Sequence, residues 1–192
     1  MSASPSGQSY SLEEYLHLAE GTDHRLEYLN GEIFAMAGAT LEHSRLCQAL
    51  SVELGGQLRN RPCRPYGQDL RIYVAAANLL AHPDLSVICG DPVLRDGSMD
   101  ATNPTVIVEV LSNSTEKYDR GRKRENYQLL DSLRDYMLVD QYRRRIEVFS
   151  RGDASMAWAL RVQAAGDIVS LASIAVTFAV DDLYASAAVT VP

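Results

Sequence analysis

Hydrophobic and polar positions along this chain recur with the periods of both helices and strands. Leucines return every fourth position across residues 40–59, which is the spacing of one helix face, so we expect a helix there. Residues 11–19 begin with a capping-box pattern, a Ser followed three positions later by Glu, and predict a shorter helix. Asn30-Gly31 lies between two apolar runs and predicts the turn of a β-hairpin within residues 25–37.

The rest of the chain reads mainly as strands. Short apolar runs predict them over residues 62–75, with an interruption near Gly67, then 85–88, 106–111, 136–140 and 145–150, with further pieces near Trp158 and over 168–180. One helix is expected among them, from Asp119 as its N-cap to Leu130. Since no repeat, linker or second domain is visible, we expect a flexible leader over residues 1–9 and a single domain over 10–192.

Two acidic residues stand in strongly apolar surroundings. Glu109 interrupts the otherwise aliphatic run 106–111, and Asp84 comes directly before the apolar run 85–88. An ionised carboxylate buried without a positive partner costs several kcal/mol, by an order-of-magnitude estimate. Two such acids on two short strands suit a divalent metal ion. The alternatives are a salt bridge between Glu109 and a buried arginine, and a role for Asp84 as a simple strand-start acid.

Composition and charge describe an ordinary globular chain of 192 residues, 46% hydrophobic and 22% charged. The net charge of −7 argues against coating nucleic acid by bulk electrostatics, although a local basic groove stays open. Cys47, Cys63 and Cys89 are odd in number and lack metal-type spacing, so we expect free thiols in a reducing compartment. The sequence predicts no membrane segment and no signal peptide, and hence a cytoplasmic protein.

An ordered series of motifs resembles a known nuclease family. RLEYLNGEIFAMAGAT, HPDLSVI, NPTVIVEVLSNSTEKYDRGRK and YMLVDQ, with His43 opening the helix between the first two, are similar to the Uma-type restriction endonuclease family of the PD-(D/E)XK nuclease superfamily. The resemblance runs from about Tyr10 to Tyr184. It implies an α/β (α+β) fold with a restriction-endonuclease-like core, a mixed central sheet flanked by helices, an N-terminal hairpin and C-terminal strand additions. It also implies a Mg²⁺- or Mn²⁺-dependent endonuclease acting on DNA.

The resemblance assigns roles to individual residues. Asp84 and Glu109 would be the metal ligands, joined by the backbone carbonyl of Val110. Glu27 and His43 match recurring acidic and histidine positions, and either could accept a proton or bind a second ion. From the sequence alone, His43 could equally be a hydrogen-bonded core residue, and Glu27 a solvated acid on an exposed face.

One position departs from the superfamily pattern. A lysine belongs two residues after the second acid, and Leu111 stands there. The helical spacing of Lys123, Tyr127 and Leu130 places them on one face that should turn toward the sheet. We therefore predict that Lys123 approaches Asp84 and Glu109 from this helix, with Arg120 as a possible substitute.

Three further predictions concern partners. Arg120, Arg122 and Arg124 either grip DNA phosphates or form a solvated helix face. The apolar tail from Trp158 to Val189 predicts a homodimer. Leu111 and the negative net charge favour a rival reading, a nuclease-fold module that binds nucleic acid or a partner protein without cutting it.

Overall fold

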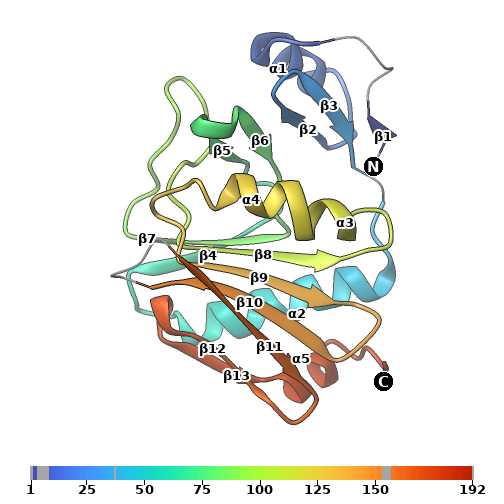
Figure 1. Cartoon of the computed structure of the whole chain (residues 1–192), viewed down its shortest axis with the longest axis vertical. Helices are drawn as coiled ribbons and strands as arrows, with labels where there is room; N and C mark the ends of the chain where they lie inside the picture. Colours follow the sequence, from blue (N-terminus) through green and yellow to red (C-terminus); the bar gives the residue numbers. More distant parts are fainter. Residues whose placement is uncertain (1, 4–8, 37, 153–156, 192) are drawn as a thin grey trace.

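A six-stranded mixed sheet forms the centre of the fold in the computed structural model, which describes residues 2–3, 9–36, 38–152 and 157–191 (Figure 1). Its order is β11-β10-β9-β8-β7-β4. The strands are β4 (Cys63–Gly67), β7 (Leu85–Cys89), β8 (Val106–Leu111), β9 (Asp135–Asp140), β10 (Arg145–Arg151) and β11 (Trp158–Ala164). Strands β8 and β9 run parallel, and the other neighbours are antiparallel. The segment connecting β8 to β9 carries helical turns, as a parallel crossover requires.

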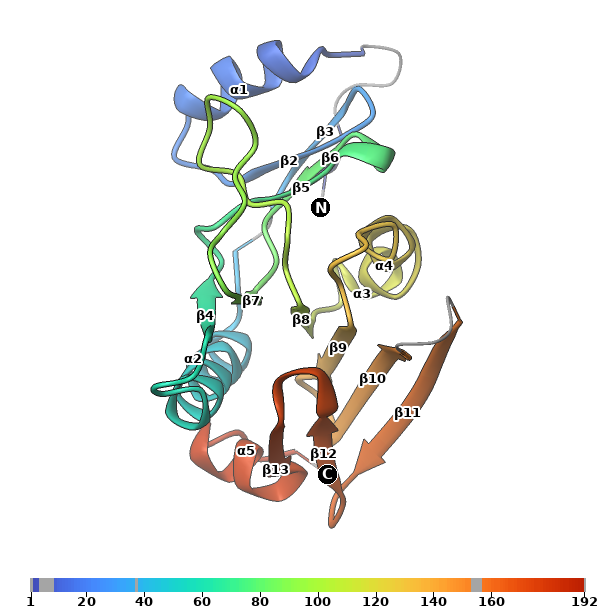
Figure 2. The ribbon, with the colours of Figure 1, turned by 90° about the vertical axis from the view of Figure 1, so that its left-hand side faces the viewer.

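Both faces of this sheet are covered, which explains why β8 and β9 are buried along their whole length. One face packs against α2 (Leu41–Gln57), α5 (Val180–Ser186) and the hairpin of β12 (Ile168–Leu171), a short 3₁₀ turn (Ala172–Ile174) and β13 (Val176–Ala179). The other face packs against α3 (Glu116–Tyr118), a π-helical turn (Asp119–Lys123) and α4 (Arg124–Tyr127). Figure 2 shows α2 and α5 on one side of the sheet and α3 and α4 on the other.

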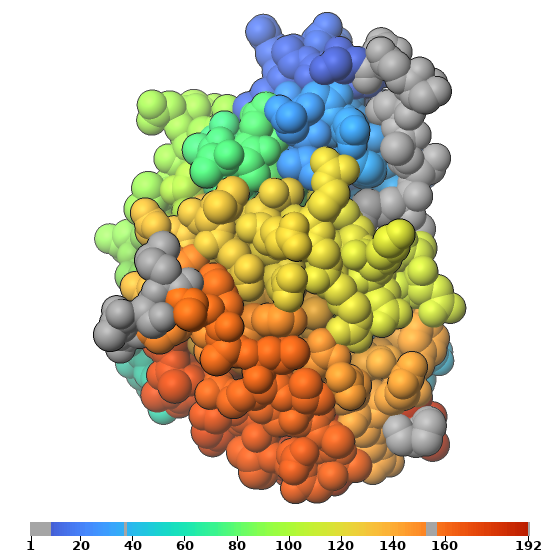
Figure 3. All heavy atoms as spheres, viewed as in Figure 1, coloured from blue at the N-terminus to red at the C-terminus, as the bar shows by residue number. Residues whose placement is uncertain are grey.

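A second sheet of five strands lies beyond α3 and α4, in the order β1-β3-β2-β6-β5. It contains β1 (Ser2–Ala3), β2 (Leu26–Leu29), β3 (Glu32–Ala35), β5 (Ile72–Val74) and β6 (Leu79–Ala81), with a 3₁₀ turn over Ala75–Ala77 and α1 (Leu12–Glu20) alongside. Figure 3 shows the α3–α4 segment, in yellow, between this sheet, in blue and green, and the orange strands. The crossover segment is thus enclosed from two sides.

Several predicted elements are confirmed. The capping box opens α1, since Ser11 Oγ accepts the N–H of Glu14 while the Glu14 carboxylate accepts the N–H of Ser11. Asn30 and Gly31 both have positive φ, as the predicted tight turn between β2 and β3 requires. The apolar run over 62–75 is interrupted after Gly67, and its two parts, β4 and β5, belong to different sheets.

The predicted helix over residues 119–130 is wrong in its start and its regularity. It begins at Glu116, passes through the π-helical turn, where Gly121 has non-helical dihedrals, and ends at Tyr127. Asp119 is not an N-cap; it is buried inside the π-helical turn, with a carboxylate oxygen 3.9 Å from the amine of Lys123. An i,i+4 contact between opposite charges accounts for that inward orientation.

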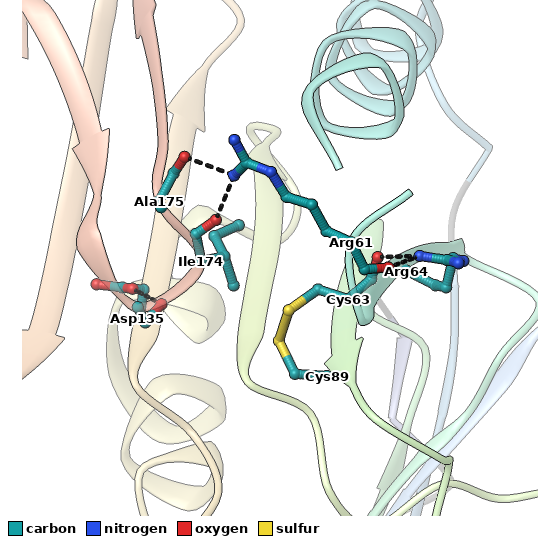
Figure 4. Close-up of a disulfide and its surroundings, with 8 residues drawn as sticks. Arg61, Cys63, Arg64, Cys89, Asp135, Ile174 and Ala175 are labelled. Atoms are coloured by element: carbon teal, nitrogen blue, oxygen red, sulfur yellow. Dashed lines mark hydrogen bonds between the residues drawn. A yellow bond between two sulfur atoms is a disulfide. The ribbon is translucent and has the colours of Figure 1, made fainter. Parts of the chain in front are cut away.

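The expectation of three free thiols is corrected by a disulfide between Cys63 and Cys89 (Figure 4). The two residues lie directly opposite each other on the neighbouring antiparallel strands β4 and β7, a register that spacing alone does not reveal. Nearby, Arg61 donates to the backbone carbonyls of Ile174 and Ala175. Disulfides are rare in reducing compartments, so this disulfide argues against a cytoplasmic location. The cytoplasmic location stays a prediction. Cys47 is free, as expected.

Most of the apolar tail has a different explanation from the one predicted. From Val169 to Val189 it supplies core side chains beneath the six-stranded sheet, and residues 180–186 form a helix that the sequence pattern did not predict. Leu160, Val162 and Ile168 are exposed, and the homodimer stays a prediction. Of the predicted leader, Ser2–Ala3 pair with β3, and residues 1 and 4–8 lie outside the described residues. No described helix combines the length and the hydrophobicity needed to cross a bilayer.

Candidate active site

The predicted acids meet where the pairing of β7 with β8 ends. The antiparallel ladder stops at the pair Leu85–Val108. Beyond this pair, the backbone N–H of Val110 donates to the carboxylate of Asp84 at 2.7 Å. The side chain thus replaces the backbone carbonyl that a continued ladder would supply. The N–H and C=O of one strand residue point toward the same neighbour, so the carbonyl of Val110 also faces this edge.

His43 reaches the same carboxylate from the first turn of α2. Thr40 caps this helix by accepting the backbone N–H of His43 at 3.1 Å. The ring Nε2 then lies 3.1 Å from Asp84 Oδ2, and both side chains are mostly buried. Burial opposes the charged ring, but the hydrogen bond and charge of Asp84 raise the pKa of His43 above its ordinary value. Protonated His43 and ionised Asp84 thus stabilise each other.

Lys123 reaches Glu109 of β8 from the π-helical turn, as predicted for a lysine that replaces the one absent at position 111. Its amine is fully buried and lies 2.8 Å from Glu109 Oε1 and 3.0 Å from Glu27 Oε1. The side chains of Lys123 and Tyr127 are both buried toward the sheet, as their helical spacing predicted. Leu111, at the superfamily's lysine position, packs instead into the core beneath α4. The predicted approach of Lys123 to Glu109 is confirmed, and Lys123 and Asp84 line the same pocket.

Glu27 brings the second sheet into this site. It lies on β2, is fully buried, and accepts the backbone N–H of His82 at 3.0 Å. His82 stands two residues before Asp84, so this contact ties the β2 hairpin to the segment that carries a predicted metal ligand. A buried acid held by a backbone donor and an ammonium is not the solvated acid that the sequence left open.

His43, Asp84, Glu109 and Lys123 line a pocket of about 130 Å³. The rest of its lining comes from the segments before β2 and after β3, the segments after β4 and before β7, the end of β8 with the turn that follows, and the π-helical turn. The lining residues are Arg25, Met36, Gly38, Ala39, His43, Gln68, His82, Asp84, Glu109, Val110, Ser112, Ser114, Thr115, Asp119 and Lys123.

Negative charge exceeds positive charge around Lys123. Burial raises the pKa of Glu109 well above its ordinary value; Lys123 lowers it, and the charges of Asp119, Asp84 and Glu27 raise it again. Burial likewise raises the pKa of Asp119 to about 6. Burial alone would lower the pKa of Lys123, but Glu109 and Glu27 raise it well above the usual value, so the amine stays charged. One ammonium therefore serves several carboxylates.

The donors present fit a divalent cation. The carboxylates of Asp84 and Glu109 and the carbonyl of Val110 are the oxygen ligands that Mg²⁺ and Mn²⁺ prefer. Within the described part of the chain, Glu27 Oε2 and Glu109 Oε1 are buried oxygens without a well-aligned hydrogen-bond donor, although Lys123 is in ion-pair range of Glu109. A bound cation would relieve both the excess charge and these unpaired oxygens.

The three predicted phosphate-binding arginines do not line the pocket. Arg120 pairs with Glu116 and Glu147, so it does not substitute for Lys123. Arg124 lies with its guanidinium 4.5 Å from the centre of the Phe149 ring. Arg122 is 60% exposed, with Glu32 at 3.6 Å, and is the most accessible of the three.

Two side chains near the site were not given a role by the sequence. The sequence predicts Asp119 only as a helix cap, yet its position four residues before Lys123 is a usable signal for an ion pair. It predicts Cys47 only as a free thiol, but Cys47 Sγ lies 3.5 Å from His43 Nδ1, at the i,i+4 spacing on α2.

Comparisons with known proteins agree with this architecture. The crystal structure of a putative nuclease belonging to DUF820 from Anabaena variabilis superposes with a TM-score of 0.75 at 18% identity, covering 93% of this chain and 99% of that one. At this identity the likeness concerns the fold, and it confirms the restriction-endonuclease-like α+β class.

Two relatives from Synechocystis sp. are similar over most of their length. The uncharacterized protein slr1290 is 37% identical over 174 residues, covering 91% of this chain and 90% of the relative. The uncharacterized protein sll1609 is 34% identical over 139 residues, covering 72% and 78% respectively. A family model described as "Putative restriction endonuclease" matches residues 12–181, nearly the whole of the fold described above. The chain therefore belongs to the Uma2 family.

Proposed function

We propose that this protein is a Mg²⁺- or Mn²⁺-dependent endonuclease that hydrolyses phosphodiester bonds of DNA. The observation that carries the proposal is the burial of the Lys123 amine against Glu109, in the pocket that Asp84 also lines. Lys123 would complete the superfamily's set of two acids and a lysine from the crossover segment. Family membership supports the nuclease class.

Asp84, Glu109 and the carbonyl of Val110 would hold the ion. When bound, it would supply positive charge at the scissile phosphate and make a water molecule more acidic. Lys123 would orient the attacking water or stabilise the negative charge that develops on the phosphate. Glu27 keeps the Lys123 amine charged and fixed in place.

His43 would accept the proton of the attacking water in its neutral form, which a cation on Asp84 would favour by offsetting the carboxylate charge that raises the pKa of the ring. The Asp84 carboxylate holds its Nε2, which orients the ring at the pocket wall. Attack of the water oxygen on phosphorus would break the bond to the 3′ oxygen, leaving 5′-phosphate and 3′-hydroxyl ends, as the superfamily resemblance implies. Arg122, exposed at the surface, is the best candidate for a contact to a flanking phosphate.

The rival function is a module that binds DNA or a partner protein without cutting. The ion pairs of Lys123 with Glu27 and Glu109 are compatible with this function, because the same contacts can serve only to stabilise the fold. Metal binding separates the two functions, since a non-cutting module has no need of Mg²⁺ at Asp84 and Glu109.

The test is incubation of supercoiled plasmid with the protein and Mg²⁺ or Mn²⁺. Asp84→Ala and Glu109→Ala should each abolish cleavage while the variants still fold, because each removes a ligand of the proposed ion. Glu42→Ala, at an exposed position next to His43, is the matched control and should cleave normally. Cleavage retained by Asp84→Ala would end the metal-ligand assignment, and unfolding of both variants would indicate a structural ion pair instead.

A further inference from the structure

A sulfur donor lies beside a nitrogen and an oxygen donor of the pocket wall. Ligand atoms of Cys47, His43 and Asp84 all lie within 4.8 Å of one another. The Cys47 Sγ is 3.5 Å from His43 Nδ1, and His43 Nε2 is 3.1 Å from Asp84 Oδ2. Ligand atoms around a tetrahedral zinc ion are separated by about 3.3–3.8 Å, given its usual bond lengths. His43 meets the two neighbours through opposite ring nitrogens, and an imidazole binds an ion through one of them. A turn of the His43 ring with small shifts of Cys47 and Asp84 would therefore bring one donor from each residue onto one ion.

The backbone already holds these donors in place. His43 and Cys47 are four residues apart on α2, so they project from one face of the helix, the spacing by which helices chelate zinc. Thr40 caps the first turn, and the N–H of Val110 fixes the Asp84 carboxylate. Donors on rigid elements lose little conformational freedom when an ion binds.

We propose that His43, Cys47 and Asp84 form a binding site for a thiophilic divalent cation such as Zn²⁺. A set of one thiolate, one imidazole and one carboxylate selects zinc or cobalt over magnesium, which avoids sulfur and requires oxygen ligands. Three protein ligands leave the fourth position of a tetrahedral ion open, and His43 and Asp84 expose it to the pocket. The Cys47 thiol would release its proton to solvent on coordination.

A nucleophilic role for the same cysteine is the competing reading. The order Cys47, His43, Asp84 resembles a cysteine–histidine–acid triad. Burial, however, raises the pKa of Cys47 far above the usual value, and Cys47 itself does not line the pocket. A thiol that is neutral and out of reach of a substrate does not serve as a nucleophile.

The zinc site would share Asp84 with the magnesium site proposed above. An ion bound to His43, Cys47 and Asp84 would remove one ligand from the other site, so Zn²⁺ should inhibit Mg²⁺-dependent cleavage. This consequence rests on the proposed function, whereas binding of the thiophilic ion does not.

The experiment measures binding to the full chain, cleared of metals with a chelator. Co²⁺ should give the thiolate-to-cobalt charge-transfer absorption, and calorimetry should show a single Zn²⁺ bound per chain. Cys47→Ala should abolish the absorption and weaken Zn²⁺ binding at least about 100-fold, because a direct ligand matters no less than its supporting shell. A variant carrying both Cys63→Ala and Cys89→Ala retains Cys47 as its sole cysteine and should keep the absorption.

Three results would overturn the proposal: no charge-transfer absorption with the wild type, unchanged Zn²⁺ affinity of Cys47→Ala, or loss of the absorption in the folded double variant. Mg²⁺ affinity should be equal in the wild type and Cys47→Ala. In plasmid assays, Zn²⁺ should inhibit the wild type and spare Cys47→Ala. The spectroscopic test involves no DNA. A wild type that binds Zn²⁺ but never cleaves would therefore refute the proposed nuclease function and leave the zinc site standing.

Discussion

Asp100 and Glu109 are both buried acids, yet their surroundings differ in one decisive way. Asp100 is fully buried between two arginines, with Arg71 Nε at 2.6 Å from one oxygen and Arg95 Nη2 at 2.8 Å from the other. Glu109 has Lys123, and that amine also faces Glu27 and Asp119. The first acid has two cations, whereas the second shares one cation with other acids.

The comparison separates a structural acid, Asp100, from a candidate metal ligand, Glu109. A buried carboxylate whose oxygens are all paired is costly to remove, because its cations lose their partner, and it has no use for a ligand. A group of carboxylates with excess charge raises its own pKa values and favours any cation that enters. The balance of charge around a buried acid, rather than burial itself, is thus the useful sign of a metal-binding pocket.

The largest expected effect is on stability at the structural acid. Asp100→Ala should lower the free energy of unfolding by about 3–5 kcal/mol, since it leaves two guanidinium groups without their partner. Urea denaturation measures it, with Asp69→Ala as the control: Asp69 is 91% exposed in its pair with Arg25, and its loss should cost about 0.2–1 kcal/mol. A larger loss for Glu109→Ala than for Asp100→Ala would reverse the comparison.

Lys123→Met removes the ammonium that Glu109 shares with Glu27. Cleavage should slow about 10²- to 10³-fold, the cost of removing one group that stabilises charge in the transition state. Metal affinity, measured by calorimetry, should barely fall, because the carboxylates remain. Lys117→Met, at the other lysine of the chain, which is exposed, is the matched control. Unchanged cleavage by folded Lys123→Met would assign this amine to structure alone.

A smaller effect is expected from the pH dependence of stability. The pKa of Asp119 is about 6 in the fold and about 3.9 in an unfolded chain, so the folded state binds the extra proton between these values. Stability should therefore rise as pH falls from 7.5 to 5, by about 1.4 kcal/mol, because this interval reaches one unit below the pKa of Asp119 in the fold. Urea titrations with chelator at both pH values should show a weaker dependence for Asp119→Asn. An equal pH dependence in both proteins would contradict the raised pKa.

Local patterns in the sequence were sufficient to place the central parts of the site. The aliphatic run around Glu109 has the composition of a strand buried on both faces, and such strands show through hydrophobicity alone. The spacing of Lys123 and Tyr127 identified the buried face of the crossover segment because helical periodicity survives an irregular turn.

What the sequence did not predict depends on contacts between distant segments. The register that sets Cys63 opposite Cys89 results from the pairing of β4 with β7, and no local pattern encodes it. The π-helical turn around Asp119 forms because buried charges are satisfied there, against local preference. The burial of Glu27 follows from docking of the second sheet, which a hairpin signal cannot reveal.

The contact between Glu27 and Lys123 has a consequence for how the protein folds. Glu27 and its partner His82 are 55 residues apart, and His43 and Asp84 are 41 apart, so the pocket joins segments that meet only after long loops have closed. Lys123 can lose its hydration at little cost only once the N-terminal hairpin has arrived. The pocket should therefore be among the last regions to gain protection from amide hydrogen exchange during refolding, so that a nascent chain becomes competent only when its tertiary structure is complete.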